Sequence, residues 1–101
     1  MWILHRSQPQ DDSDDSVMFR LRTGAIKTLG RAPRADFVID APLVSRLHCR
    51  LTATHDALEV VDLSSTNGTY VNGKRVEKAK LVTGDRLRVG RVELEVKRHR
   101  R

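Results

Sequence analysis

Three short segments of this 101-residue chain contain arginine, hydroxyl and amide side chains that could together bind an anion. A guanidinium group offers planar, bidentate donors to an anion, Ser and Thr offer rotatable hydroxyls, and an Asn amide can bridge an extended backbone. If these groups were brought together, they would form a phosphate-binding site. Taken singly, each segment also has the residue types from which turns are made. The segments are Gly30-Arg31, Ser45-Arg46-Leu47-His48 and Ser64-Ser65-Thr66-Asn67-Gly68.

Catalytic chemistry has little support in the sequence. None of the four histidines lies four residues from another, and there is a single cysteine, so we expect no metal site. Cys49 alternates with charged neighbours as a core residue does, and no third group is identifiable that would orient His48 as a base for Ser45. No glycine-rich loop leads into a helix. We therefore expect neither an enzyme nor a bound cofactor.

The elements that must position these residues are predicted to be strands. Apolar and polar residues alternate over most of the chain, and such alternation over four to seven residues predicts one buried and one exposed face. No stretch of eleven residues has a clean helical period. Strands are expected near residues 2–5, 17–22, 27–29, 38–39, 48–54, 58–62, 69–71, 86–89 and 92–97.

Turn signals separate these strands at short intervals. Asn67-Gly68 and Asn72-Gly73 favour tight turns because both residue types tolerate positive φ. Many short strands with regular turns predict an all-β chain, an antiparallel β-sandwich of about eleven strands. Parallel pairs are not expected, because nothing here can serve as a crossover helix. Loops at one end of a sandwich meet even when they are far apart in the chain, which would unite the three segments.

The net charge raises the question of nucleic-acid binding. Lys and Arg number 19 against 13 Asp and Glu, a formal charge of +6. Residues 1–16 carry one Arg and four Asp, a balance of −3, so the rest of the chain holds +9, and four of those nine charges lie in residues 97–101. The remainder is spread over many segments, and aromatic residues are too few for a base-stacking platform. Nucleic acid is therefore not the expected partner.

The length fits a single domain over residues 1–101. Residues 7–16, rich in Ser, Asp and Gln, are expected to form a flexible acidic loop, and residues 97–101 a solvated basic tail. There is no apolar run of about 18 residues and no signal pattern, so no membrane association is expected. One cysteine cannot form an internal disulfide. These features favour an intracellular protein, in the cytoplasm or, in a eukaryote, the nucleus.

The three segments occur in the order and with the compact spacing of the forkhead-associated (FHA) family of phosphothreonine-peptide readers, which the chain resembles from about Phe19 to Val96. Gly-Arg alone carries no information and Ser-x-x-His little, but the Asn-Gly segment in register with both is specific. The resemblance implies an eleven-stranded β-sandwich whose loops at one end grip a phosphothreonine peptide. Further matching residues are Thr69, Val71-Asn72-Gly73, Gly84-Asp85 and Val89-Gly90.

The resemblance also implies which residues would touch the ligand. Arg31 would bind the phosphate or the adjacent peptide backbone, Ser45 would donate its hydroxyl to a phosphate oxygen, and Arg46 would supply a second cation. Thr66 would line the pocket beside the γ-methyl group of phosphothreonine. Asn67 would hydrogen-bond the ligand backbone on both sides of it. The alternative for Arg31 and Arg46 is an ordinary solvated arginine.

Four further residues would support the site. Gly30 and Gly68 would allow close backbone approach, and His48 and Asn72 would hold the loops by hydrogen bonds. The function that follows is a non-enzymatic, monomeric module that binds a partner phosphorylated by a Ser/Thr kinase, and so mediates kinase-dependent protein–protein interaction in signalling. Two alternatives remain open: a phosphate-independent assembly domain that uses a sheet face, and a weak nucleic-acid binder that uses the basic surface.

Overall fold

The computed structural model describes residues 1–6 and 18–99. Eleven β-strands form in this part of the chain, and no helix occurs in it. The strands are β1 (Trp2–Arg6), β2 (Met18–Leu21), β3 (Ile26–Gly30), β4 (Phe37–Val38), β5 (Cys49–Ala53), β6 (Leu58–Asp62), β7 (Thr69–Val71), β8 (Lys74–Val76), β9 (Lys78–Leu81), β10 (Arg86–Val89) and β11 (Val92–Arg98). The predicted all-β class and strand number are confirmed.

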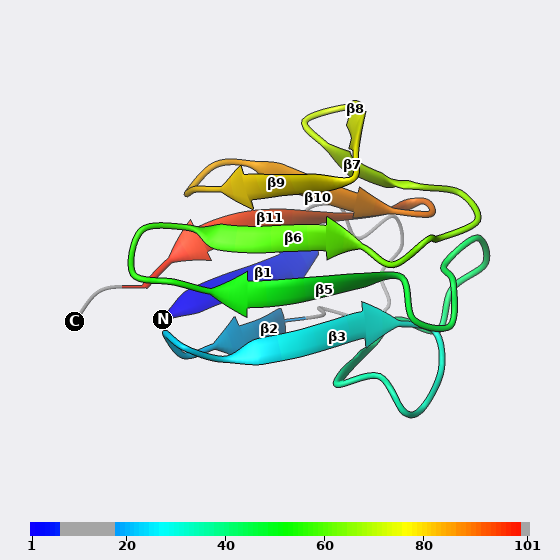
Figure 1. Ribbon diagram of the computed structural model, residues 1–101, viewed down its shortest axis with the longest axis horizontal. Coiled ribbons are helices and arrows are strands. Elements are labelled where there is room, and N and C mark those ends of the chain that lie inside the picture. The colour runs from blue at the N-terminus through cyan, green and yellow to red at the C-terminus, as the bar shows by residue number, and fades with distance from the viewer. Residues whose placement is uncertain (7–17, 100–101) are drawn as a thin grey trace.

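The strands form two sheets packed face to face (Figure 1). The six-stranded sheet has the order β2-β1-β11-β10-β7-β8, and the five-stranded sheet has the order β4-β3-β5-β6-β9. In Figure 1 the strands β3, β5, β6 and β9 lie in front of the other sheet. The core between the sheets consists of Trp2, Leu4, Leu21, Leu29, Ile39, Val44, Cys49, Leu51, Ala53, Leu58, Val60, Leu81, Leu87, Val89, Val92, Leu94 and Val96.

Strand β11 shows how alternation determines which face is buried. Val92, Leu94 and Val96 are buried, and the residues between them are only partly so. In the neighbouring antiparallel strands, Leu4 of β1 lies opposite Val96 and Leu87 of β10 lies opposite Leu94. Directly opposed side chains project to the same side of a sheet, so the alternation in each strand builds one continuous apolar layer.

The expectation that all pairs are antiparallel is wrong at one place. Strand β4 pairs parallel to β3, with Leu29 opposite Phe37 and Gly30 opposite Val38. A parallel pair usually needs a long crossover because the chain must travel back along a whole strand. Here β4 has only two residues, and its first residue lies opposite Leu29, one residue before the end of β3. The chain therefore travels back along β3 by only about one residue, and the loop 31–36 is long enough for that return. Phe37 then stacks on Phe19 of β2, with ring centroids 4.5 Å apart, and links the edges of the two sheets.

Two strands, β8 and β9, were not among those predicted individually. They carry Lys74 and Arg75, and Lys78 and Lys80, and each lies at the outer edge of its sheet. Edge strands are commonly charged, which protects the edge but removes the apolar alternation that would reveal the strand. The basic tail was predicted to begin at residue 97, but β11 extends to Arg98. The predicted acidic loop, residues 7–16, lies outside the described residues.

The loops 31–36, 39–48 and 63–68 meet at one end of the sandwich, on the right in Figure 1, and are called the apical loops below. They follow β3, β4 and β6, and the last of them leads into β7. Within residues 1–6 and 18–99 no helix is long and apolar enough to cross a membrane.

Candidate functional site

Backbone hydrogen bonds join the first two apical loops. The Arg31 N–H donates to the Ser45 carbonyl at 2.9 Å, and the Ala32 N–H donates to the Arg46 carbonyl at 3.1 Å. A Cβ atom at Gly30 would lie 2.1 Å from the Arg46 carbonyl oxygen, a distance that no side chain can adopt. Gly30 therefore permits the backbone approach on which the position of Arg31 depends.

His48 connects the second apical loop to the third. Its imidazole is fully buried; Nδ1 accepts from the Ser45 N–H at 3.0 Å, and Nε2 lies 2.8 Å from the Gly68 carbonyl oxygen. A backbone N–H can only donate and a carbonyl can only accept, so both contacts are satisfied when the proton is on Nε2. This neutral tautomer holds Ser45 and Gly68 from opposite sides of one ring.

The third apical loop is shaped by the carboxylate of Asp62. The Ser65 N–H and hydroxyl donate to it, and so does the hydroxyl of the buried Thr69, at 2.7 Å. Burial alone would raise the pKa of Asp62, but these hydrogen bonds together hold it below its ordinary value. The Ser65 hydroxyl oxygen also accepts from the Gly68 N–H at 2.9 Å, and Gly68 itself adopts a φ of 89°.

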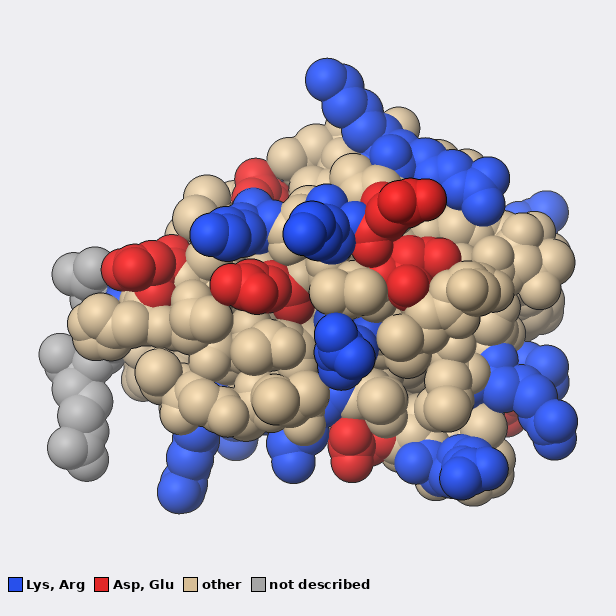
Figure 2. All heavy atoms as spheres, in the orientation of Figure 1, with Lys and Arg blue, Asp and Glu red and all other residues tan. Residues whose placement is uncertain are grey.

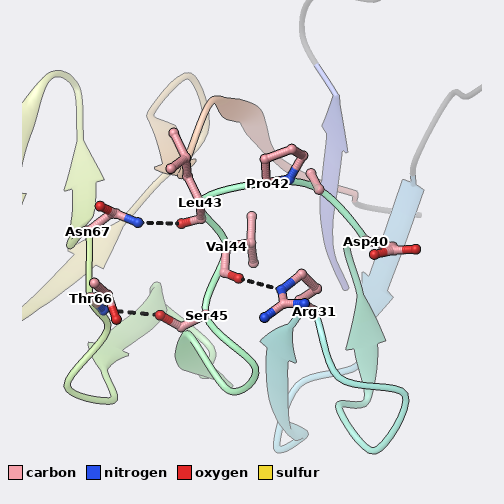
Figure 3. A pocket seen from close by; sticks show the side chains of 9 residues that line it. Arg31, Asp40, Pro42, Leu43, Val44, Ser45, Thr66 and Asn67 are labelled. Atoms are coloured by element: carbon pink, nitrogen blue, oxygen red, sulfur yellow. Dashed lines mark hydrogen bonds between the residues drawn. The ribbon is translucent and has the colours of Figure 1, made fainter.

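Two backbone carbonyls of the second apical loop orient the side chains of Arg31 and Asn67. The Arg31 Nε–H donates to the Val44 carbonyl at 3.0 Å, and the Asn67 amide donates to the Leu43 carbonyl at 3.1 Å (Figure 3). Leu43 has a φ of 72°, which is unusual for a residue with a side chain and turns its carbonyl toward Asn67. Sequence reasoning missed both contacts, because a backbone carbonyl belongs to every residue and leaves no sequence signal.

Thr66 is joined to Ser45. The Thr66 N–H donates to the Ser45 hydroxyl oxygen at 3.0 Å, so the third loop is held against the second at the residue expected to contact phosphate (Figure 3). These loops enclose an open depression of about 530 Å³. Its lining residues are Arg31, Asp40, Ala41, Pro42, Leu43, Val44, Ser45, Thr66 and Asn67. Four of the five predicted ligand-contacting residues therefore line one depression.

Arg46, the fifth, lies beside this depression. Its side chain lines two adjoining hollows, one together with Arg31 and Asp40 and the other together with Arg34. Arg46 is exposed, and it shares the lining of one of these hollows with Arg31.

Asn72, which was expected to support the site by hydrogen bonds, does not line the depression. Its amide donates to Asp85 at 3.0 Å and its carbonyl oxygen accepts from the Arg86 N–H at 2.9 Å. Strand β7 separates Asn72 from Gly68, the last residue of the third apical loop, by roughly 13 Å at about 3.3 Å per residue. Asn72, with a φ of 50°, therefore shapes the β7–β8 hairpin and ties it to the start of β10.

The groups that could suggest other chemistry lie elsewhere. Cys49 is buried in the core, and burial, with a smaller contribution from Asp62, raises the pKa of its thiol to about 12. The thiol therefore stays protonated and unreactive at neutral pH. Among the residues that the structure describes, no three His, Cys, Asp or Glu side chains are grouped so as to hold a metal ion.

Comparison with known proteins points to one family. The FHA domain family profile matches residues 27–90. The chain is 40% identical over 70 residues to the glycogen accumulation regulator GarA of Mycobacterium tuberculosis. That match covers 69% of this chain, and the chain spans only 43% of the length of GarA.

Solved structures agree over nearly the whole chain. A structure from an analysis of phosphothreonine-dependent FHA domain interactions superposes with a TM-score of 0.84 at 31% identity, covering 99% of this chain and 98% of the other. The FhaA FHA domain, complexed with the intracellular domain of a second protein, superposes with a TM-score of 0.81 at 31% identity. That superposition covers 95% of this chain and 99% of the FhaA chain.

Proposed function

This chain belongs to the FHA domain family, and we propose that its apical loops bind a phosphothreonine-containing segment of a partner protein. The observation that carries the proposal is the convergence of Arg31, Ser45, Thr66 and Asn67 on one open depression. Three loops from distant parts of the chain supply these residues, and the related FHA domain structure comes from a study of phosphothreonine-dependent interactions.

The hydrogen bonds already made within the site leave the donors that a phosphate needs. Arg31 uses Nε for the Val44 carbonyl, so its two terminal amino groups are left to make a bidentate contact with a phosphate. The Ser45 hydroxyl accepts from the Thr66 N–H, which leaves its own hydrogen to donate. Arg46 would add a second positive charge at the rim. Phosphothreonine carries a charge of about −1.5 to −2 near neutral pH and matches this set.

Thr66 and Asn67 would recognise the rest of the phosphoresidue. Thr66 would line the pocket next to the γ-methyl group that distinguishes phosphothreonine from phosphoserine. Asn67 spends one amide hydrogen on the Leu43 carbonyl and keeps the other, together with its carbonyl oxygen, for the ligand backbone. Gly30, His48 and Gly68 would support the site through the contacts described above, and no catalytic residue is required.

The proposal describes a regulatory binding module that responds to a Ser/Thr kinase. It would be a single, monomeric domain with no enzymatic activity and no cofactor, acting inside the cell where such a kinase can modify its partner. A contact of this size, with a few charge-assisted hydrogen bonds, is expected to bind with a Kd of about 1 μM, or roughly −8 kcal/mol.

The decisive experiment compares peptides that differ only in phosphorylation. A degenerate phosphothreonine library first supplies a binding sequence, which is then made with phosphothreonine, phosphoserine and unmodified threonine. Isothermal titration calorimetry is expected to give micromolar affinity for the phosphothreonine peptide, weaker binding of phosphoserine, and no detectable binding of threonine. Equal affinity for the modified and unmodified threonine peptides would contradict the proposal.

Two further measurements separate the alternatives. A nucleic-acid binder would lose affinity for DNA or RNA steeply as salt rises. On the face over the five-stranded sheet, acidic and basic groups are interspersed, with Glu59 opposite Lys80 (Figure 2). This mixture disfavours binding of a nucleic-acid phosphate backbone to that face.

A phosphate-independent assembly domain would still bind its partner after the double change Arg31→Ala and Ser45→Ala.

A further inference from the structure

A second hollow lies beside the proposed phosphate site and has a different character. It has a volume of about 520 Å³ and is lined by Ala32, Pro33, Arg34, Arg46 and Leu47. Two arginines therefore line one hollow whose other lining residues are apolar. Leu47 is 37% exposed, a large apolar side chain open to solvent next to the two charges.

Neither cation of this hollow is neutralised from within the described chain. Among residues 1–6 and 18–99, no carboxylate lies within ion-pair distance of Arg34 or Arg46. Asp40 lines the depression at the proposed phosphate site, and it lines the hollow that Arg31 and Arg46 share. It does not line the hollow formed with Arg34. Asp36 is the acidic residue nearest to Arg34 in the sequence. Its carboxylate accepts hydrogen bonds from the Thr28 N–H at 2.8 Å and from the Thr28 hydroxyl at 3.2 Å.

The segment that carries Arg34 is held in place before any ligand arrives. Its turn is closed by the Ala35 N–H, which donates to the Ala32 carbonyl at 3.0 Å, and Ala32 is itself bonded to the Arg46 backbone. On the other side, Asp36 is bonded to Thr28 through both its side chain and its N–H. A fixed backbone lowers the entropy lost when the Arg34 side chain engages a ligand.

We propose that Arg34 and Arg46 form a second anion subsite, which binds an acidic or phosphorylated side chain of the same ligand near its phosphothreonine. Guanidinium groups bind carboxylate and phosphate by the same bidentate geometry, so both sources of negative charge fit. Pro33 and Leu47 cover the aliphatic part of that side chain. Arg46 lies between the two sites and serves both. The inference rests on the proposed function and adds a charge preference to it.

The test is a positional scan of peptides by fluorescence anisotropy. A base peptide has one phosphothreonine flanked by alanines, and each of the five positions on either side is replaced in turn by Glu, Lys or phosphoserine. Glu at one or two positions is expected to tighten binding about three- to fivefold at low salt, and phosphoserine about tenfold, because it carries nearly twice the charge. Lys at those positions is expected to weaken binding.

Variants at Arg34 test whether this residue causes the preference for acidic positions, since Arg34 takes no part in the proposed phosphate contact. Arg34→Ala is expected to bind the base peptide as the native chain does and to lose most of the Glu preference, and Arg34→Glu to prefer Lys instead. Arg22→Glu is the matched control. It makes the same change in net charge at the exposed turn between β2 and β3, opposite the apical loops, and should leave the preference intact.

The outcomes are distinct. An enhancement by Glu that persists unchanged in Arg34→Glu, or the absence of any enhancing position, overturns the second subsite while the phosphothreonine contact stands. A base peptide that binds no better than its unphosphorylated form overturns the proposed function and the subsite together. Enhancement by phosphoserine without enhancement by Glu shows that the subsite takes a second phosphate rather than a carboxylate.

Discussion

Arg31 illustrates why the type of cation matters at the level of a single residue. Its Nε–H is committed to the Val44 carbonyl, which aims the terminal amino groups at the ligand side. A lysine has the same charge, but its one ammonium group cannot hold that carbonyl and also bind a phosphate in bidentate fashion. Arg31→Lys is therefore expected to weaken phosphothreonine binding at least tenfold, and Arg31→Ala by about 2 kcal/mol or more, roughly thirtyfold.

Calorimetry with the matched peptides measures these losses, and thermal unfolding of the same samples controls for folding. Because Arg31 is exposed, both variants should keep the melting temperature of the native chain to within a few degrees. Native affinity in Arg31→Lys would show that charge alone is sufficient and that the contact with Val44 does not orient the side chain.

Asp62 makes the third apical loop sensitive to acid. Its pKa is below the ordinary value of 3.8, so its ionised form stabilises the folded chain. That stabilisation is present above pH 3.8 and is lost as the pH falls through the lower folded-state value. Asp62→Asn, which weakens the hydrogen bonds from Ser65 and Thr69, is expected to cost about 2 kcal/mol at pH 7.

Urea unfolding of the native chain and of Asp62→Asn at pH 7 and pH 3 tests this residue. The difference in the free energy of unfolding between the two proteins should narrow at pH 3, because below pH 3.8 the Asp62 carboxylate of the unfolded chain binds a proton before that of the folded chain does. A difference that is the same at both pH values would show that the charge of Asp62 does not contribute.

The side chains of the site could be predicted from sequence, but their orientation could not. Arg31, Ser45, Thr66 and Asn67 lie in three recognisable segments that line one depression. The carbonyls that orient two of them come from the second loop and depend on its conformation, including a leucine with positive φ. The resemblance implied that Asn72 supports the loops by hydrogen bonds, and sequence could not show that its partners would be Asp85 and Arg86.

At the level of the elements, the approach of one loop to another depends on Gly30. A Cβ atom there would overlap the Arg46 carbonyl oxygen at 2.1 Å, so Gly30→Ala must push the first two apical loops apart. The expected loss is about 2–3 kcal/mol of stability, together with weaker phosphothreonine binding. Gly24→Ala serves as the control, because Gly24 has open space around it and only its φ of 94° opposes a side chain.

Chemical denaturation of the two variants separates crowding from backbone strain. Gly24→Ala is expected to cost about 1 kcal/mol and to leave binding unchanged, since its turn lies opposite the apical loops. If Gly30→Ala and Gly24→Ala lost the same stability, or if Gly30→Ala bound the phosphothreonine peptide with native affinity, the close approach of the first two apical loops would not be required.

The strands that sequence predicted are those whose side chains alternate between core and solvent. β6, β7 and β10 have the predicted bounds, and β1, β5 and β11 differ by one residue at an end or at both. β8 and β9 could not be placed in this way, because edge strands have fewer apolar contacts to satisfy. The parallel β3–β4 pair has only two residues and depends on the shape of a loop, which alternation does not record.

At the level of the whole molecule, the two sheets share one apolar core and should unfold together. Trp2 is 2% exposed, and its indole N–H donates to the Thr54 carbonyl at 2.9 Å, a bond between the first strand and the turn that follows β5. Trp2 is the only tryptophan, so its fluorescence reports the contact between the sheets. Fluorescence and far-ultraviolet circular dichroism are expected to give the same urea midpoint and a single transition. A fluorescence change at lower urea would show that the sheets separate first.

Both described ends of the chain lie away from the apical loops, side by side on the left in Figure 1. The His99 N–H donates to the Met1 carbonyl at 2.7 Å, and Trp2 lies opposite Arg98 in the sheet. A tether, a label or a fused protein attached at either end would therefore sit behind the domain and leave the loops facing outward. This polarity allows the domain to be immobilised through either end for binding measurements, and to occupy any position in a longer polypeptide without turning its binding face inward.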